Sequence, residues 1–511
     1  MLHGALLGNE KVCIEEKRVI ARPFCPCSLL YLPVLLRVMS RKYYFLLSSI
    51  ACFYSAAFAQ FLVTVNMDES LREMDGFGAS SGWYTDEYMT LLDASTRADF
   101  IEAMFDPKTG LGLTLHRVRI DSDFEGNSQT YPFINWEHEP YDGQFAREVQ
   151  DAYDPYLMLS QWTPPPWMKD NNSKFKGGSL LPEYYDEYAL YQAEYILDLK
   201  NEFGVEVDGF SFQNEPGVKS WASCEWTTAQ IIDYLKNHLI PTFIDKGLIP
   251  ADPSEDWGVD LMVNEETAWH DHQLNVILKD PAIEPHIRIA AAHNYGGNYA
   301  TRTFDTARSL GKRVWQTEFY NKGREGEEND TIGYGLLIGR IMHNFFINND
   351  VNLYNYWWMM SASGKDQQCL IKMTDDNTDF AVMKQGYVFG QYSRFIRPGY
   401  QRIANSNPFP QLGAGVNGPI DTNVTIGVSA YTNVTGDRLV VIAINDTANP
   451  ESIDLTIVDT DGSISTMEAW RTSETENMQA ATPVTVTDNE ATLSLPPYSI
   501  TTYVGETGTD L

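Results

Sequence analysis

Two glutamates that close apolar stretches are the residues of this sequence best suited to chemistry. Glu215 ends "DGFSFQNEPG" (208–217), directly after Asn214, and Glu318 lies near the end of "RVWQTEFY" (313–320). Two facing carboxyls can cleave a glycosidic bond, because one can protonate the leaving oxygen while the other attacks the anomeric carbon. The amide of Asn214 would hold the 2-hydroxyl of the sugar. The alternatives are an ordinary polar strand end for Glu215 and a salt-bridged strand end for Glu318.

A closed barrel is the scaffold that would bring these glutamates together. Eight strand-like stretches alternate with helix-like ones, of which 184–203 and 227–243 have the clearest helical spacing. The strand-like stretches are 72–80, 113–121, 156–164, 207–216, 259–266, 288–295, 313–320 and 352–360. This alternation predicts an α/β fold, a (β/α)8 TIM barrel, in which the fourth and seventh strands face each other and end at one rim.

The ends of the other strands carry further polar and aromatic side chains. Because the carboxyl ends of parallel strands meet at one rim, we expect these groups to converge there. They are Arg117, Arg119 and Asp121, Trp162 and Trp167, Glu265 and Glu266, His293, Asn294 and Tyr295, Tyr320, and Trp357 and Trp358. Core packing is the alternative for each tryptophan, and a satisfied core histidine is the alternative for His293.

The pattern changes after about residue 395, where helix-like stretches end and short β-rich runs begin. These runs predict a fused C-terminal antiparallel β-sandwich side domain. The strand-like stretch 61–68 precedes the barrel and is expected to join the same sheet. The predicted organisation is a strand of the side domain at 60–70, a catalytic barrel at 71–395 and a β-sandwich at 396–511.

The first 59 residues have the features of a processed leader. Residues 39–59 hold Arg41 and Lys42, an apolar run and Ala57-Phe58-Ala59, which together predict a signal peptide, and 1–38 fit an upstream extension that is not native. A transmembrane anchor is the alternative, although the apolar run is short for one. We therefore expect a secreted, extracellular protein.

Charge and cysteine content limit the partners of the predicted mature chain. The whole chain has a net charge of −32, and residues 1–59 contribute seven Lys and Arg against three Asp and Glu, which leaves about −36. Such a charge disfavours nucleic acids and anionic membranes as partners. Cys224 and Cys369 remain, either bridged or as two free buried thiols. The sequence shows no ligand cluster for a metal or an organic cofactor, and we expect neither.

Several motifs resemble glycoside hydrolase family 30, a family of clan A retaining β-glycosidases, nearest its xylanase branches. They are "GFGAS" (76–80), "SQWTPPPWMK" (160–169), "SFQNEP" (211–216), "HNYGG" (293–297), "VWQTEFY" (314–320), "YNYWW" (354–358) and "YSRFIRPGYQRI" (392–403). The resemblance implies a barrel with a fused side β-sandwich. It also implies that Glu215 is the acid/base and Glu318 the nucleophile of a double displacement that retains configuration.

The resemblance also implies roles for the neighbouring side chains. Arg117 would keep Glu318 ionised, Tyr295 would reach the nucleophile, and Trp357 would form the floor under the sugar at the cleavage site. Trp162 and Trp167 would form subsite walls, and Tyr320 and His293 would belong to the substrate site. Glu266 would correspond to an acid at the end of the family's fifth strand.

Two departures from the family pattern bear on specificity. The segment after the eighth strand (359–377) holds no arginine to pair with a glucuronate, only Lys365 and Lys372, so we expect no strict glucuronate dependence. The long aromatic segment 120–144 would close one end of the cleft and favour short products.

Together, these features predict a secreted O-glycosyl hydrolase that cleaves β-1,4-xylosidic linkages in plant cell-wall xylan, as an endo-xylanase or by releasing xylobiose. It is expected to be a monomer. A β-1,6-glucanase or another β-glycosidase on the same scaffold is the enzymatic alternative. A non-catalytic carbohydrate-binding protein is the alternative of another class.

Overall fold

The computed structural model describes residues 60–508, apart from 84, 121, 123–128, 135, 137–140, 256–257, 296–301, 322–329, 362–365, 377, 409–424 and 461. The expected extension (1–38) and signal peptide (39–59), Asp121, Lys365 and much of segment 120–144 therefore lie outside the described residues. Among the helices in the described part of the chain, none is both long and apolar enough to cross a bilayer.

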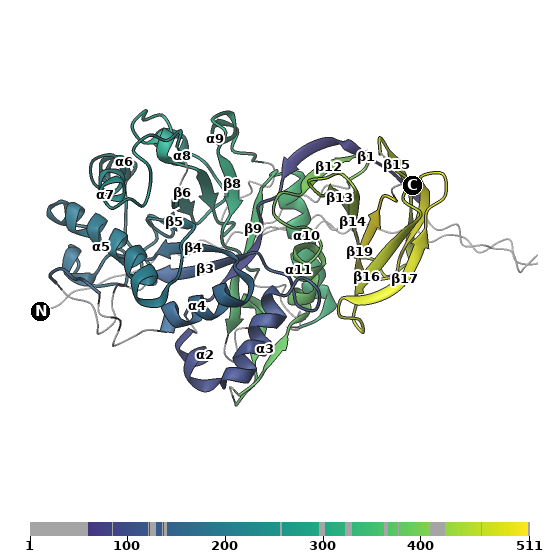
Figure 1. The fold of residues 1–511 in the computed structure, drawn as a ribbon, viewed down its shortest axis with the longest axis horizontal. Coiled ribbons are helices and arrows are strands. Elements are labelled where there is room, and N and C mark those ends of the chain that lie inside the picture. Colours follow the sequence, from purple (N-terminus) through teal and green to yellow (C-terminus); the bar gives the residue numbers. More distant parts are fainter. Residues whose placement is uncertain are drawn as a thin grey trace, which may run out of the picture. The chain divides into compact units, whose positions relative to one another are not determined.

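Eight parallel strands close into a barrel, which confirms the predicted fold class (Figure 1). They are β2 (Gly76–Ser80), β3 (Leu115–Ile120), β4 (Tyr156–Gln161), β5 (Gly209–Ser211), β6 (Asp260–Glu266), β7 (Ile289–Ala292), β8 (Arg313–Gln316) and β9 (Leu353–Ser361). Neighbours in sequence pair in parallel, with a register shift between β6 and β7. The barrel closes because β9 pairs with β8, through Trp315 opposite Leu353, and with β2, through Gly76 opposite Leu353. Seven of the eight predicted stretches contain one of these strands, and the eighth, 352–360, misses only the last residue of β9.

Helices follow most of the barrel strands. They are α2 (Thr85–Leu91), α3 (Ala94–Phe105), α4 (Tyr141–Tyr153), α5 (Tyr185–Asp198), α6 (Thr228–Tyr234), α7 (Ile240–Asp245), α8 (Leu274–Ile277), α9 (Asp305–Ser309), α10 (Ile332–Ile347) and α11 (Lys384–Ser393). The start of α6 shows how the sequence sets these boundaries. The Thr227 hydroxyl accepts from the Gln230 N–H while the Gln230 side chain accepts from the Thr227 N–H, a capping box.

The alternation of side chains between the two faces of each strand separates two apolar cores and positions the polar groups. On β3, Leu115 belongs to a small apolar cluster with Met158, Trp315 and Leu353, residues of β4, β8 and β9. Val118 belongs instead to the large core under the helices. Since successive side chains point to opposite faces of a strand, Arg117 lies on the same face as Leu115, one layer nearer the C-terminal rim. A layer of apolar side chains thus supports the charged layer.

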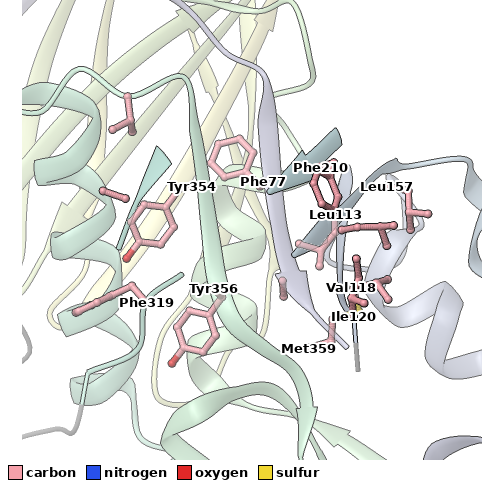
Figure 2. Close-up of a cluster of buried hydrophobic side chains, with 14 of the residues drawn as sticks. Phe77, Leu113, Val118, Ile120, Leu157, Phe210, Phe319, Tyr354, Tyr356 and Met359 are labelled. Carbon is pink, nitrogen blue, oxygen red and sulfur yellow. The ribbon is translucent and has the colours of Figure 1, made fainter. Parts of the chain in front are cut away.

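The large core fills the space between the barrel and its helices. Tyr354 of β9 packs against Phe346 of α10 with ring centroids 6.3 Å apart, and Tyr356 packs against Phe389 of α11 at 6.2 Å. Figure 2 shows part of this layer, including Phe77 of β2 and both tyrosines of β9. Such close packing holds the strand ends, and hence the side chains on the rim, in fixed positions.

A second sheet of nine strands contains the C-terminal region and the stretch before the barrel. Its order is β17-β16-β19-β14-β13-β12-β1-β15-β18. The strands are β1 (Gln60–Glu73), β12 (Gln401–Asn405), β13 (Ile426–Thr432), β14 (Arg438–Asn445), β15 (Glu451–Val458), β16 (Thr466–Thr472), β17 (Gln479–Thr485), β18 (Glu490–Leu495) and β19 (Ser499–Glu506). All neighbours are antiparallel except β1 and β15, which are parallel, so the sheet is mostly rather than wholly antiparallel.

Helices α10 and α11 connect the second sheet to the barrel. The Thr502 hydroxyl donates to the Gln391 carbonyl at 2.7 Å, and Arg340 pairs with Asp446 at 2.7 Å. Phe395, just beyond α11, packs against Trp470 of β16 at 5.0 Å. Because these contacts join buried side chains across the junction, we expect the sheet to stabilise the barrel.

Two further features were not fixed by the sequence. Strand β10 (Cys369–Met373) adds to β9 in parallel, and β11 (Phe380–Val382) pairs with β10. Cys224 and Cys369 are both buried and free, so of the two alternatives the structure has two thiols rather than a disulfide.

Candidate active site

Charged side chains from five strands or strand ends meet at the C-terminal rim of the barrel. Arg117 lies on β3 and Glu265 on β6, while the others follow β5, β7 and β8. We call these five residues, Arg117, Glu215, Glu265, His293 and Glu318, the mouth cluster. Each of the five is at most 5% exposed. The sequence predicted that these strand ends would converge, but it did not single out Glu265.

The carboxyls of Glu215 and Glu318 are close enough to act on one bond. One oxygen of each, together with a ring nitrogen of His293, forms a group in which every atom lies within 4.8 Å of the others. In retaining glycosidases the two carboxyl groups are about 5–5.5 Å apart, whereas inverting enzymes leave about 6.5–9.5 Å for a water molecule. The separation therefore fits retention.

The backbone at Glu215 has an unusual conformation. Its φ is +50°, in the left-handed region that a residue with a Cβ rarely adopts. The Glu215 N–H donates to the Glu265 carbonyl at 2.9 Å, and the Asn214 N–H donates to the Gln161 carbonyl at 2.6 Å. These bonds fix the turn after the short strand β5 and direct Asn214 and Glu215 into the mouth. Strain held in this way is common at functional sites.

Arg117 bonds to several members of the cluster at once. Its Nη1 donates to Glu318 Oε2 at 2.6 Å, and its Nη2 donates to Asn214 Oδ1 at 2.7 Å and Glu265 Oε1 at 3.1 Å. The guanidinium is fully buried. A buried charge of this kind is tolerated only when it is paired and hydrogen-bonded. Arg117 therefore holds the nucleophile candidate and orients the Asn214 amide.

Glu265, rather than Glu266, is the acid of β6 that joins the mouth cluster. The Ser160 hydroxyl donates to Glu265 Oε2 at 2.5 Å. Burial alone would raise the pKa of Glu265, but Arg117, His293 and Ser160 outweigh it and lower the pKa to about 2. Glu265 is therefore a carboxylate throughout the working pH range.

Glu266 makes different contacts and does not take the role suggested for it. Its Oε2 lies 2.8 Å from His270 Nδ1, and Asn264 Nδ2 donates to its Oε1 at 3.2 Å. Burial raises its pKa to about 7. The register of β6 against β7 shifts between Asn264 and Glu266, and Glu265 has φ +42°. This irregularity decides which of two adjacent glutamates points inward, and simple alternation could not reveal it.

His293 lies among the carboxyls. Its Nδ1 is 3.1 Å from Glu215 Oε1, and its Nε2 is 3.6 Å from Glu265 Oε1 and 4.0 Å from Glu318 Oε2. Burial would lower the pKa of His293, but the charge of Glu318 and the contacts with Glu215 and Glu265 outweigh it and raise the pKa to about 9. Of the two interpretations considered from the sequence, the structure favours participation in the site.

The protonation of Glu318 depends on opposing effects. Burial, together with the neighbouring Glu215, raises the pKa of Glu318 above its ordinary value, although His293 and Arg117 lower it in part. Because Arg117 donates to it at 2.6 Å, we take Glu318 to be ionised. Burial and the charge of Glu318 raise the pKa of Tyr295 well above its ordinary value, so that its hydroxyl stays protonated.

An aromatic wall lies beside Arg117. Trp162 faces its guanidinium at 4.7 Å and Trp357 at 6.0 Å, while the two indoles are 6.0 Å apart. Trp358 stacks on Trp357 at 4.9 Å, and the half-buried Tyr320 packs against the same group. These flat faces at the rim are suited to sugar rings. Trp83, which the sequence did not single out, packs on Trp162 at 5.9 Å.

Trp167 lies in a different environment from Trp162. Its ring packs against Tyr184 at 5.3 Å and Phe133 at 6.4 Å, beside the large core. Core packing therefore accounts for Trp167, and the structure does not bring it into the aromatic wall. The two tryptophans share one motif, so only the path of the chain after β4 separates them.

The spacing of Glu215, His293 and Glu318 would also admit a cation. Arg117, however, already places a positive charge on Glu318 at 2.6 Å, and a metal ion there would be repelled by it. The donor set is therefore better suited to moving a proton and a glycosyl group than to holding a metal.

The chain is similar in sequence to glycoside hydrolases. No protein-family model matches the chain. A glucuronoxylanase named XynC from Bacillus subtilis is 26% identical over 451 residues, which cover 86% of this chain and 91% of that protein. An endo-1,6-β-D-glucanase from Aspergillus fumigatus is 27% identical over 215 residues, 36% of this chain and 43% of that protein.

Solved structures are similar over nearly the whole described region. The glycoside hydrolase family 30 subfamily 8 xylanase Xyn30A from Clostridium acetobutylicum superposes with a TM-score of 0.70 at 25% identity. The match covers 87% of this chain and 99% of that one. A second family 30 enzyme, an endoxylanase from Clostridium papyrosolvens, gives a TM-score of 0.66 at 25% identity, covering 87% and 100%.

Proposed function

We propose that the chain is a member of glycoside hydrolase family 30, near its xylanase branches, and that it cleaves β-1,4-xylosidic linkages by a retaining double displacement. The observation that carries the proposal is the pair of carboxyls, Glu215 and Glu318, of which one oxygen each lies within 4.8 Å of the other across the barrel mouth. This spacing supports direct attack by one carboxylate on the anomeric carbon.

In the first step, Glu318 attacks the anomeric carbon and forms an ester with it. The bond from that carbon to the glycosidic oxygen breaks, and Glu215 gives its proton to the leaving oxygen. In the second step, water attacks the same carbon, Glu215 takes a proton from the water, and Glu318 leaves as a carboxylate. Two inversions at one carbon give net retention.

The neighbouring residues support these steps. Arg117 keeps Glu318 ionised and in position, since it donates to Oε2 at 2.6 Å. The same guanidinium holds Asn214 Oδ1 at 2.7 Å, which leaves the amide NH2 of Asn214 to bond the sugar 2-hydroxyl. Trp357 supplies the floor under the reacting sugar, and Trp162 and Tyr320 supply its walls. The phenol of Tyr295, kept neutral by burial, donates toward Glu318 or the sugar ring.

We propose that the enzyme does not depend strictly on a glucuronate side group, although one relative is named a glucuronoxylanase. Segment 359–377 has no arginine. Lys372 lies on β10, and Lys365 is outside the described residues. The net charge of −32 also disfavours anionic side groups. The proposal includes secretion and a monomeric state.

A β-1,6-glucanase is the second candidate, because the Aspergillus relative bears that activity in its name. Product profiles on linear xylan, glucuronoxylan, arabinoxylan and β-1,6-glucan separate the candidates. We expect comparable cleavage of linear xylan and glucuronoxylan and none of β-1,6-glucan. Cleavage of β-1,6-glucan alone would replace the proposal by the second candidate. Binding without turnover of any of the four would contradict both.

A further inference from the structure

The mouth cluster contains three carboxyls but only two groups that can carry positive charge. Glu215, Glu265 and Glu318 surround Arg117 and His293, and all five are buried. If His293 is positive, the cluster is neutral when one carboxyl holds a proton. If His293 is neutral, the same state carries an uncompensated negative charge, which a buried site tolerates poorly.

Resting on the function proposed above, we propose that His293 is a permanent imidazolium that positions the proton of Glu215 and balances the negative charge as it moves between Glu318 and Glu215. It acts through the two carboxyls and is thus a positioning residue. The groups that face it are Glu215 after β5, Glu265 on β6, Tyr295 after β7, Glu318 after β8, and Arg117 on β3 behind Glu265 and Glu318.

The geometry around the two ring nitrogens favours the doubly protonated ring over either neutral form. A ring protonated only at Nδ1 would direct the lone pair of Nε2 at Glu265 Oε1, 3.6 Å away, and Glu318 Oε2, 4.0 Å away. A ring protonated only at Nε2 would have to accept at Nδ1, where Glu215 Oε1 lies at 3.1 Å. The proton of Glu215 would then point at the ring instead of the substrate.

The imidazolium presents an N–H on each side of the ring: Nδ1 makes a hydrogen bond with Glu215, while Nε2 makes none and acts through its charge alone. Its Nδ1–H donates to Glu215 Oε1, so the acidic proton of Glu215 must reside on Oε2, free to reach the glycosidic oxygen. Its Nε2–H faces two carboxylates. The elevated pKa of His293, about 9, agrees with this geometry.

The charge of the cluster then stays constant through the reaction. At rest, Arg117 and His293 balance Glu265 and Glu318, while Glu215 holds the proton. When the ester forms, Glu318 becomes neutral and Glu215 becomes the carboxylate, so the total is still zero. The negative charge moves from one side of the imidazole ring to the other. His293 lies within 4.0 Å of both positions and need not gain or lose a proton.

Loss of the positive charge of His293 should move the pH profile of kcat/KM to higher pH. In His293→Gln, a positive charge beside Glu215 and Glu318 is lost, which makes the negatively charged forms of the two carboxyls less favourable. Both limbs of the kcat/KM profile, measured on a xylo-oligosaccharide whose leaving sugar needs protonation, should then shift to higher pH by about one to three units. A lower kcat with unmoved limbs would overturn the proposal, since a neutral hydrogen-bonding role would give that result.

The matched control is His116→Gln. His116 is also a fully buried histidine of a barrel strand, but it packs against Phe145 at 5.3 Å, and burial lowers its pKa to about 3. It is therefore neutral already. Its replacement should leave both limbs in place, whereas an equal shift in both variants would contradict the proposal.

A measurement without turnover keeps the inference separate from the proposed function. In the wild-type protein labelled with ¹⁵N-histidine, NMR should show one buried ring that is protonated at both nitrogens between pH 5 and 8. The signals of this ring should be absent from the His293→Gln spectrum. A neutral ring at that position overturns the proposal even if xylan is hydrolysed. If the ring is doubly protonated but no xylan is hydrolysed, the charge assigned to His293 stands and the proposed function is wrong.

Discussion

The two ends of the barrel both combine arginines with carboxylates, but in opposite proportions. At the lower end, where the strands begin, Asp350 pairs with Arg72, Arg308 and Arg402. At the mouth, three carboxyls share Arg117 and His293. At the lower end the cations outnumber the carboxylate, so Asp350 stays ionised and holds no proton that could move. At the mouth the carboxyls outnumber the cations, so one carboxyl must hold a proton.

The pKa values reflect this difference. Burial would raise the pKa of Asp350, but the three arginines outweigh it and lower the pKa. At the mouth, His293 is raised to about 9 and Glu265 is lowered to about 2. The lower network is therefore fixed in charge and joins β1 and β12 of the second sheet to the barrel, while the mouth cluster holds a movable proton. In the function proposed above, ion pairing at the lower end serves stability, and ion pairing at the mouth serves chemistry.

The largest effect should come from removal of Glu318, the proposed nucleophile. Glu318→Ala leaves no group to attack the anomeric carbon, so kcat on xylan should fall on the order of 10⁴-fold or more. Initial rates of reducing-sugar release measure it, with circular dichroism to verify folding. Retention of more than a few per cent of the wild-type rate would contradict the assignment.

Removal of the acid/base should have an effect that depends on the substrate. In Glu215→Ala, xylan hydrolysis should fall by about 10² to 10⁴-fold because the leaving sugar needs protonation. A 2,4-dinitrophenyl xyloside, whose leaving group needs none, should lose far less in the glycosylation step. The measurement is kcat/KM on both substrates. Equal losses on the two would show that Glu215 is not the acid.

At the lower end, Asp350→Asn should affect stability but not turnover. It leaves three arginines without their carboxylate, which should cost about 2–4 kcal/mol of unfolding free energy, allowing for partial exposure. Because the folded pKa of Asp350 is lowered, its contribution is present above the unfolded value near 4 and is lost as pH falls through the folded pKa.

Urea unfolding of wild type and Asp350→Asn at pH 7 and pH 3 tests this sign. The gap between the two proteins should shrink at pH 3, while kcat on xylan at pH 7 stays within about twofold of wild type. A large loss of kcat with unchanged stability would reverse the roles assigned to the two ends.

The smallest effect should come from Glu73→Gln. Glu73 pairs with Arg313 at 2.9 Å, but its side chain is 46% exposed. Exposed pairs of this kind contribute about 0–1 kcal/mol. Both the unfolding midpoint and kcat/KM should therefore remain close to wild type. A loss above about 2 kcal/mol would show that the lower network depends on its exposed members as much as on Asp350.

Much of the barrel and of the mouth could be predicted from the sequence. Apolar stretches ending in polar groups predicted all eight strands, because a parallel barrel has a packed interior and one functional rim. The observed strands are shorter, since hydrogen-bonded pairing stops before the chemically useful residues, as at β5 (Gly209–Ser211). Arg117, His293 and Glu318 were identified because their positions on or just after the strands place them at the same rim.

The other features of the fold and the site depend on contacts that the sequence pattern does not encode. Glu265 could not be preferred over Glu266, because the shift in β6 and a positive φ decide which one points inward. The parallel pairing of β1 with β15 joins residues nearly four hundred positions apart, such as Val63 and Leu455. Strands β16, β17 and β18 were not predicted individually, since their short runs carry a weak signal.

The central claim, that Glu318 is the nucleophile of a retaining pair, is tested most directly by trapping the intermediate. Wild-type enzyme is incubated with 2,4-dinitrophenyl 2-deoxy-2-fluoro-β-xylobioside, digested, and sequenced by tandem mass spectrometry. We predict one covalent glycosyl adduct, on the peptide that contains Glu318 and at that side chain. An adduct on Glu215 or Glu265, or turnover of xylan with inversion and no adduct, would contradict the account.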